Sequence, residues 1–235
     1  FGAFALSAGT KHPYFINAMI YLPVILISVE KIFKNKNPIY LALIVCIAEV
    51  SNFYFFYVLV IATVVYVFLR LFEIYKKDIR AMLLPLVKIA CSSVSGVILG
   101  AFVFLPVVYR LLSDSRMSLD TSTSLLYPLM YYLRLPGAFV TYSYCGVSTF
   151  FGYSIIAVFA LVAVFSSKKK NFSLKMSLII CAAGFMTPLF ASFANGFSYP
   201  TNRWMFVFSF ALTQITSASS VKASLTASHL LKTVI

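Results

Sequence analysis

The chain has 235 residues, of which 61% are hydrophobic and only 11% are charged. A soluble domain of this length could not bury that much apolar surface, so the composition excludes an ordinary water-soluble fold. Several stretches approach the roughly 20 apolar residues that cross a bilayer as a helix, and we expect an all-α, polytopic transmembrane helical bundle. The alternating pattern of outer-membrane β-strands is absent.

The charge balance bears on partners and on side-chain chemistry. The net charge of +13 would suggest nucleic acid as the partner of a soluble protein, but the basic residues gather between apolar stretches, as in cytoplasmic loops. We therefore expect contact with the lipid bilayer and no nucleic acid. Four cysteines without close spacing and two histidines predict neither a disulfide framework nor a metal site, and no cofactor-binding motif is visible.

Taken in chain order, the apolar stretches predict about seven spans within one transmembrane domain over residues 1–220. A single helix over residues 37–69 would be about 50 Å long, so we expect Ser51-Asn52-Phe53 to break it. Residues 106–147 are expected to form an outer loop, and residues 221–235 a tail without an assigned structure. The expected spans cover residues 13–29, 38–50, 54–69, 83–105, 148–165, 174–191 and 203–219.

The chain begins at Phe1 without an initiator Met or a signal-peptide pattern, so we expect a fragment of a longer protein. Basic clusters at residues 31–36, 70–80 and 168–175 predict the cytoplasmic side of the membrane. The remaining polar side chains then fall on the outer side, where we expect the active or binding surface. These residues are His12, Glu49, Asn52, Asp114, Asp120, Arg134 and Arg203.

One stretch, residues 195–204, concentrates amides, hydroxyls, aromatic rings and a guanidinium between two long apolar segments. A turn needs only Gly, Pro or Asn, so Arg203 beside Trp204 is more than a turn requires. Arg and Trp also anchor helix ends at the membrane interface without any chemistry. Both interpretations of this stretch stay open at the level of sequence.

An arginine, a carboxylate and aromatic rings at the outer leaflet suit the transfer of a sugar from an isoprenoid phosphate. The cation would stabilise the leaving phosphate, and the carboxylate would accept the proton of the acceptor hydroxyl. Glu49 is the candidate catalytic residue; at bilayer depth it needs a partner, which we expect to be Arg203, Arg134 or the substrate. The candidate substrate-binding residues are Arg203, Asn202, Tyr199, His12, Asn17, Asn52, Tyr54 and Arg134.

Three motifs in order resemble the YfhO family of bacterial membrane proteins. They are His12-Pro13-Tyr14-Phe15-Ile16-Asn17-Ala18-Met19, Ser51-Asn52-Phe53-Tyr54-Phe55-Phe56-Tyr57, and Gly196-Phe197-Ser198-Tyr199 with Asn202-Arg203-Trp204. The resemblance implies a fold like that of the GT-C glycosyltransferases, many-pass enzymes of the bacterial cytoplasmic membrane. It also implies a polyprenyl-phosphate sugar donor and a cell-envelope polymer acceptor such as lipoteichoic acid. The essential acidic residue of GT-C enzymes lies in their first extracytoplasmic loop, which would precede Phe1.

Two other functions stay open, a lipid-linked sugar transporter or flippase and a non-catalytic membrane assembly subunit. A transporter would need polar residues that continue to the inner face, and the apolar stretches contain few of them. No internal repeat with a fixed period is visible, so the sequence does not favour an inverted-repeat transporter.

Overall fold

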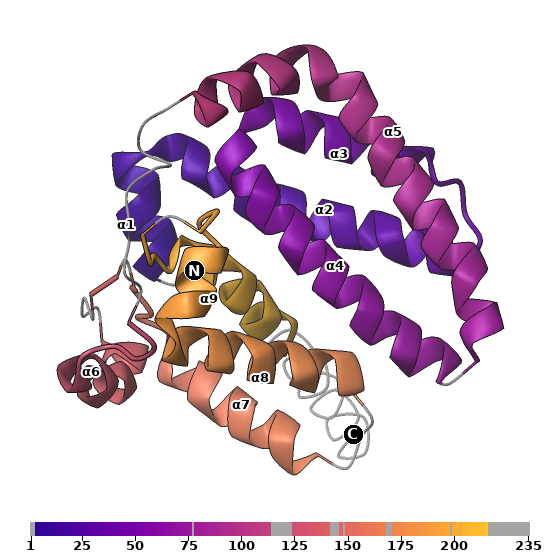
Figure 1. Ribbon diagram of the computed structural model, residues 1–235. Coiled ribbons are helices and arrows are strands. Elements are labelled where there is room, and N and C mark those ends of the chain that lie inside the picture. Colours follow the sequence, from indigo (N-terminus) through magenta and orange to yellow (C-terminus); the bar gives the residue numbers. More distant parts are fainter. Residues whose placement is uncertain are drawn as a thin grey trace, which may run out of the picture.

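The computed structural model describes residues 3–76, 78–113, 124–141, 146–147, 149–167, 171–197 and 199–215. This part of the chain consists of helices joined by turns and irregular segments, without a strand, which confirms the all-α fold class (Figure 1). Asp114, Asp120, the lysines at 168–170 and the expected tail lie outside the described residues.

The helices follow one another in this order: α1 (Ala3–Lys11), the 3₁₀ turn η1 (Pro13–Phe15), α2 (Ile16–Phe33), α3 (Ile39–Ser51), α4 (Phe53–Tyr75), α5 (Ile79–Leu112), α6 (Leu129–Val140), α7 (Ile155–Ser166), α8 (Phe172–Met186), α9 (Pro188–Phe193) and the 3₁₀ turn η3 (Arg203–Met205). A further helix covers residues 206–215. Of these, α2, α4 and α5 are long and apolar enough to cross a membrane, while α3, α7 and α8 are shorter apolar helices.

The helix break expected at residues 51–53 lies at Asn52. Its backbone is extended, with φ −161° and ψ 102°, so α3 ends at Ser51 and α4 begins at Phe53. The Asn52 side chain accepts a hydrogen bond from the Phe55 amide at 3.1 Å. This N-cap satisfies one of the free amides at the start of α4, which explains why the break falls at the asparagine.

The structure corrects the predicted start of the outer loop. We expected the loop to begin at Pro106, but α5 continues through Pro85 and Pro106 to Leu112 as one helix of 34 residues. Prolines inside a helix remove one backbone hydrogen bond each, a loss that membrane helices tolerate. The region expected to be loop also contains a helix, α6.

Arg70, which we assigned to a basic loop cluster, lies inside α4 and ties three helices together. Its guanidinium contacts Glu30 of α2 at 2.6 Å and 2.9 Å and Glu73 of α4 at 2.7 Å. Glu73 also accepts a hydrogen bond from Ser173 of α8, and the Tyr66 hydroxyl donates to Glu30 at 2.8 Å. We call Glu30, Tyr66, Arg70, Glu73 and Ser173 the Arg70 clamp. Its two-point contact with Glu30 is the geometry that fixes a guanidinium most firmly.

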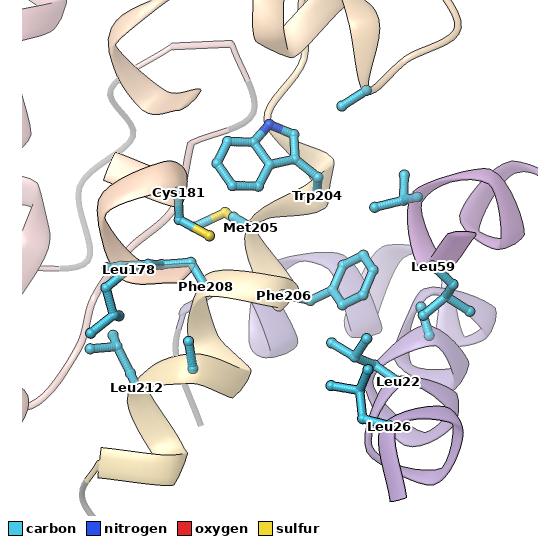
Figure 2. Packing of buried hydrophobic residues seen from close by; sticks show 14 of the residues in the cluster. Leu22, Leu26, Leu59, Leu178, Cys181, Trp204, Met205, Phe206, Phe208 and Leu212 are labelled. Carbon is cyan, nitrogen blue, oxygen red and sulfur yellow. The ribbon is translucent and has the colours of Figure 1, made fainter. Parts of the chain in front are cut away.

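Helix 206–215 lies in the middle of the bundle and sets the position of the turn before it. Phe206 points toward Leu22 and Leu59 of α2 and α4, while Phe208 lies beside Leu178 of α8 (Figure 2). The Phe206 ring also lies 5.7 Å from that of Phe55 at the start of α4. Because this helix is packed on two sides, the turn that precedes it, η3 with Arg203, is held at one end of the bundle.

Helices α3 and α5 run side by side at close range (Figure 1). A β-carbon added to Gly96 of α5 would lie 2.5 Å from the backbone oxygen of Ala42 and 2.8 Å from the β-carbon of Val45. Small residues allow such approach between membrane helices. By contrast, a β-carbon added to Gly137 of α6 would meet nothing within 4 Å.

We expect Gly96→Ala to lower the stability of the protein by about 1–3 kcal/mol, because the methyl group forces α3 and α5 apart. Gly137→Ala is the matched control and should leave stability unchanged or raise it, since alanine favours a helix. Thermal unfolding of the purified protein in detergent checks both variants. Equal melting temperatures for Gly96→Ala and the unmodified protein would contradict the close packing.

Candidate functional site

The residues of the three sequence motifs meet at one end of the bundle, around Arg203. The Arg203 guanidinium carbon lies 5.8 Å from the centre of the Phe15 ring and 5.7 Å from the centre of the Tyr54 ring. These distances are typical of cation–π contacts. The side chain of Arg203 is half-buried, and it forms no ion pair with any carboxylate in the described part of the chain. Its charge is therefore available to an anionic ligand.

His12 belongs to the same aromatic cluster. Its ring centre lies 5.0 Å from that of Phe15 and 5.5 Å from that of Tyr14, and Nδ1 lies 3.3 Å from the Tyr14 hydroxyl. Phe15 in turn packs edge-on against Phe55 at 4.7 Å. The partly buried Phe15 thus joins the exposed His12 to the core. We call His12, Tyr14, Phe15, Tyr54 and Arg203 the arginine–aromatic cluster.

Tyr199 lies on the rim of this cluster. It is 51% exposed and within electrostatic reach of Tyr54, and its backbone oxygen accepts a hydrogen bond from the Asn195 side chain at 2.9 Å. The turn that carries it needs left-handed backbone, with φ +66° at Gly196 and +59° at Phe197. Glycine adopts the first of these without strain.

Asn17 and Asn52 hold the helices that present the cluster. The Asn17 side chain donates to the Ser51 hydroxyl at 3.3 Å and so joins α2 to the end of α3. The side-chain oxygen of Asn52 is engaged in capping α4. Both residues therefore lie at the expected end of the bundle, with their described hydrogen bonds made to the protein.

Asn202, adjacent to Arg203, is fully buried with 0% exposure. Its amide nitrogen donates to the Thr149 hydroxyl at 2.8 Å and the Tyr131 hydroxyl at 3.2 Å, and its oxygen accepts from the Trp204 indole at 3.1 Å. These contacts fasten η3 to α6 and to the segment before α7. Sequence reasoning missed Tyr131 and Thr149, because no local pattern links residues so far apart along the chain.

Glu49 and Arg134 lie apart from the arginine–aromatic cluster. Arg134 is exposed on α6. Glu49 is 2% exposed and its carboxyl oxygens have no hydrogen-bond partner; Oε2 faces Gly100 of α5. Glu49 therefore pairs with neither Arg203 nor Arg134, and the third expected partner, the substrate, stays a prediction. The cause is the helical register, which turns Glu49 toward α5, while the cluster forms on η1 and the residue before it, on α4 and on η3.

A cavity of about 710 Å³ lies between α2, α4, α8 and helix 206–215. Most of its wall is apolar, with Leu22, Ala62 and Ala211 among the lining residues. Trp204, next to Arg203, also lines it, as do Glu30, Arg70, Glu73 and Ser173 of the Arg70 clamp. The cavity therefore extends from the clamp to Trp204, and no residue of the arginine–aromatic cluster is among its lining residues.

Comparison with known proteins agrees with this membrane architecture. Residues 3–231 match the family described as bacterial membrane protein YfhO. The chain is 26% identical over 210 residues to the uncharacterized protein YfhO of Bacillus subtilis (strain 168). This similarity covers 85% of the chain but only 22% of the relative, so the chain spans about a fifth of the relative's length. No solved structure matches the chain.

We expect Asn202→Ala to lower stability by about 1–3 kcal/mol, because the buried Tyr131 and Thr149 hydroxyls and the Trp204 indole lose a partner. Asn171→Ala is the control, since Asn171 is exposed and its side chain makes no capping bond to α8. Thermal unfolding in detergent measures the difference. Asn202→Ala that unfolds at the same temperature as Asn171→Ala would show that this buried network does not hold η3.

Proposed function

Because the chain belongs to the YfhO family of bacterial membrane proteins, we propose that it is part of a membrane glycosyltransferase. The reaction is the transfer of a sugar from a polyprenyl-phosphate carrier to a cell-envelope polymer, such as lipoteichoic acid, at the outer face of the membrane. The observation that carries the proposal is the half-buried Arg203, which lacks a described carboxylate partner and lies between two aromatic rings.

The cluster supplies two of the interactions that such a transfer needs. The Arg203 guanidinium binds the phosphate of the carrier and stabilises the negative charge that grows on it as the sugar leaves. The aromatic rings of Tyr54 and Phe15 orient the guanidinium, and the exposed rings of Tyr14 and Tyr199 offer apolar faces to the sugar. We assign no general base within the cluster, because Glu49 lies outside it.

The length of α2 supports the placement of this cluster at the outer face. Its 18 residues span about 27 Å, close to the roughly 30 Å hydrocarbon thickness of a bilayer. Phe15 lies at the first end and Lys31, Lys34 and Lys36 lie at or beyond the last turn. If these lysines mark the cytoplasmic side, Arg203 lies at the outer surface.

The cavity gives the carrier chain a place to bind. Its apolar wall between α2, α4, α8 and helix 206–215 suits an isoprenoid chain, and Trp204 in that wall is next to Arg203. A carrier with its phosphate on Arg203 and part of its chain in the cavity would have the sugar at the membrane surface. Binding of the chain then fixes the position of the reacting phosphate.

A lipid-linked sugar transporter or flippase is a second candidate. It is favoured by the Arg70 clamp, whose charged residues line the cavity that also reaches Trp204. A transporter needs polar groups inside the bundle, whereas a transferase does not. Purified full-length protein separates the two functions, because only a transferase forms glycosylated polymer in detergent without a membrane.

We expect Arg203→Ala to lower the transfer rate of the full-length protein by about 100-fold or more, as loss of a group that stabilises developing charge does. Arg203→Lys should recover part of the rate, and Arg134→Ala, which removes an exposed arginine outside the cluster, should have little effect. Sugar on the cell-envelope polymer is measured at matched protein levels. Unchanged glycosylation in Arg203→Ala would contradict the proposed glycosyltransferase function.

We expect Ala62→Phe to raise KM for a long-chain polyprenyl-phosphate sugar about tenfold, equivalent to ~1.4 kcal/mol, because the ring occupies the cavity. KM for a short-chain donor should stay unchanged. Val60→Phe is the matched control, since Val60 is exposed on α4 and lies outside the cavity wall. An equal rise in KM for both donors would contradict binding of the carrier chain in this cavity.

A further inference from the structure

Glu49 is enclosed where α3 packs against α5. The residue is 2% exposed, and neither of its carboxyl oxygens has a hydrogen-bond partner. Gly100 of α5 provides the space that the carboxyl occupies, because a β-carbon there would lie only 2.6 Å from Oε2. We call this contact between α3 and α5, with Gly96 and Gly100 on the α5 side, the α3–α5 seam.

The charged side chains of the helices packed against α3 do not bond to the Glu49 carboxyl. They are Glu30 and Lys31 on α2, Arg70 and Glu73 on α4, and Arg80, Lys88 and Arg110 on α5. On α5, Lys88 and Arg110 are about 18 Å and 15 Å from Gly100 along the helix axis. Glu30, Arg70 and Glu73 are paired with one another in the Arg70 clamp. Neither a charged group nor a hydroxyl in the described residues bonds to the Glu49 carboxyl.

We propose that Glu49 is a proton-binding site, which holds a neutral carboxylic acid in the α3–α5 seam at neutral pH. An ionised carboxylate without water, a cation or a hydrogen-bond donor is strongly disfavoured in an apolar interior, whereas the neutral acid is tolerated. Acidic residues inside membrane proteins face one another, a cavity or a partner for this reason. Glu30 and Glu73, which contact the Arg70 guanidinium, are the contrasting ionised carboxylates of the same bundle.

The seam also controls access to this proton. With Gly96 against Ala42 and Gly100 against the carboxyl, whose oxygens are buried, hydration of Glu49 through the seam needs α3 and α5 to separate. Ionisation of Glu49 and opening of the seam are therefore linked events. This site is independent of the proposed sugar transfer, because Glu49 lies outside the arginine–aromatic cluster.

Infrared difference spectroscopy on the purified full-length protein at neutral pH tests the proposal. We expect Glu49→Gln to remove one carbonyl stretch of a protonated carboxyl, and this band should shift in heavy water. The matched control is Asp78→Asn, which replaces an exposed acid and should remove carboxylate bands instead. Loss of carboxylate bands in Glu49→Gln, without loss of a protonated band, would overturn the proposal.

A second variant, Glu49→Asp, keeps the proposal testable if Glu49→Gln does not fold. It keeps an acid in the seam, so the protonated band should persist at an altered frequency, with normal elution in gel filtration. A folded Glu49→Asp protein that shows neither a shifted nor an unshifted protonated band would also overturn the assignment. Gly100→Ala, which crowds Oε2, should move the frequency of the same band, whereas Gly137→Ala should not.

Discussion

The contact of one guanidinium with two aromatic rings organises one end of this bundle. Arg203 can take its position over Phe15 and Tyr54 because helix 206–215 is packed between α2, α4 and α8. Asn202, buried and fully engaged, fixes the turn from the other side. A cation held by ring faces rather than by a carboxylate keeps its charge for a ligand.

The two ends of the bundle use their arginines in opposite ways. Arg70 is saturated by Glu30 and Glu73 and holds three helices together, whereas Arg203 has no such partner among the described residues. The cavity between α2, α4, α8 and helix 206–215 is lined by the Arg70 clamp and by Trp204, which follows Arg203 in the sequence. The two ends of the bundle therefore differ: Arg70 is occupied by carboxylates, whereas Arg203 can bind an anion. This difference suits an amphiphilic ligand with its phosphate at the Arg203 end.

Sequence patterns predicted the all-helical class and the break at Asn52, because each is encoded in local composition. They also singled out His12, Tyr54 and Arg203 as candidates, but not Phe15, which contacts Arg203 from η1. The enclosure of Glu49 against Gly100 was not predictable in this way, because it depends on how α3 packs on α5, far along the chain. The continuation of α5 through Pro106 was missed for a related reason. Proline lowers the propensity for a helix, but in an apolar setting the backbone hydrogen bonds favour its continuation.

The sidedness of the arginine–aromatic cluster is tested most directly by cysteine accessibility in intact cells. In a full-length background without native cysteines, Tyr199→Cys and Lys36→Cys place thiols at exposed positions at opposite ends of the bundle. We expect a membrane-impermeant maleimide to label the cysteine at 199 in intact cells, and the one at 36 only after the membrane is permeabilised. The reverse pattern would place Arg203 in the cytoplasm and contradict transfer at the outer face.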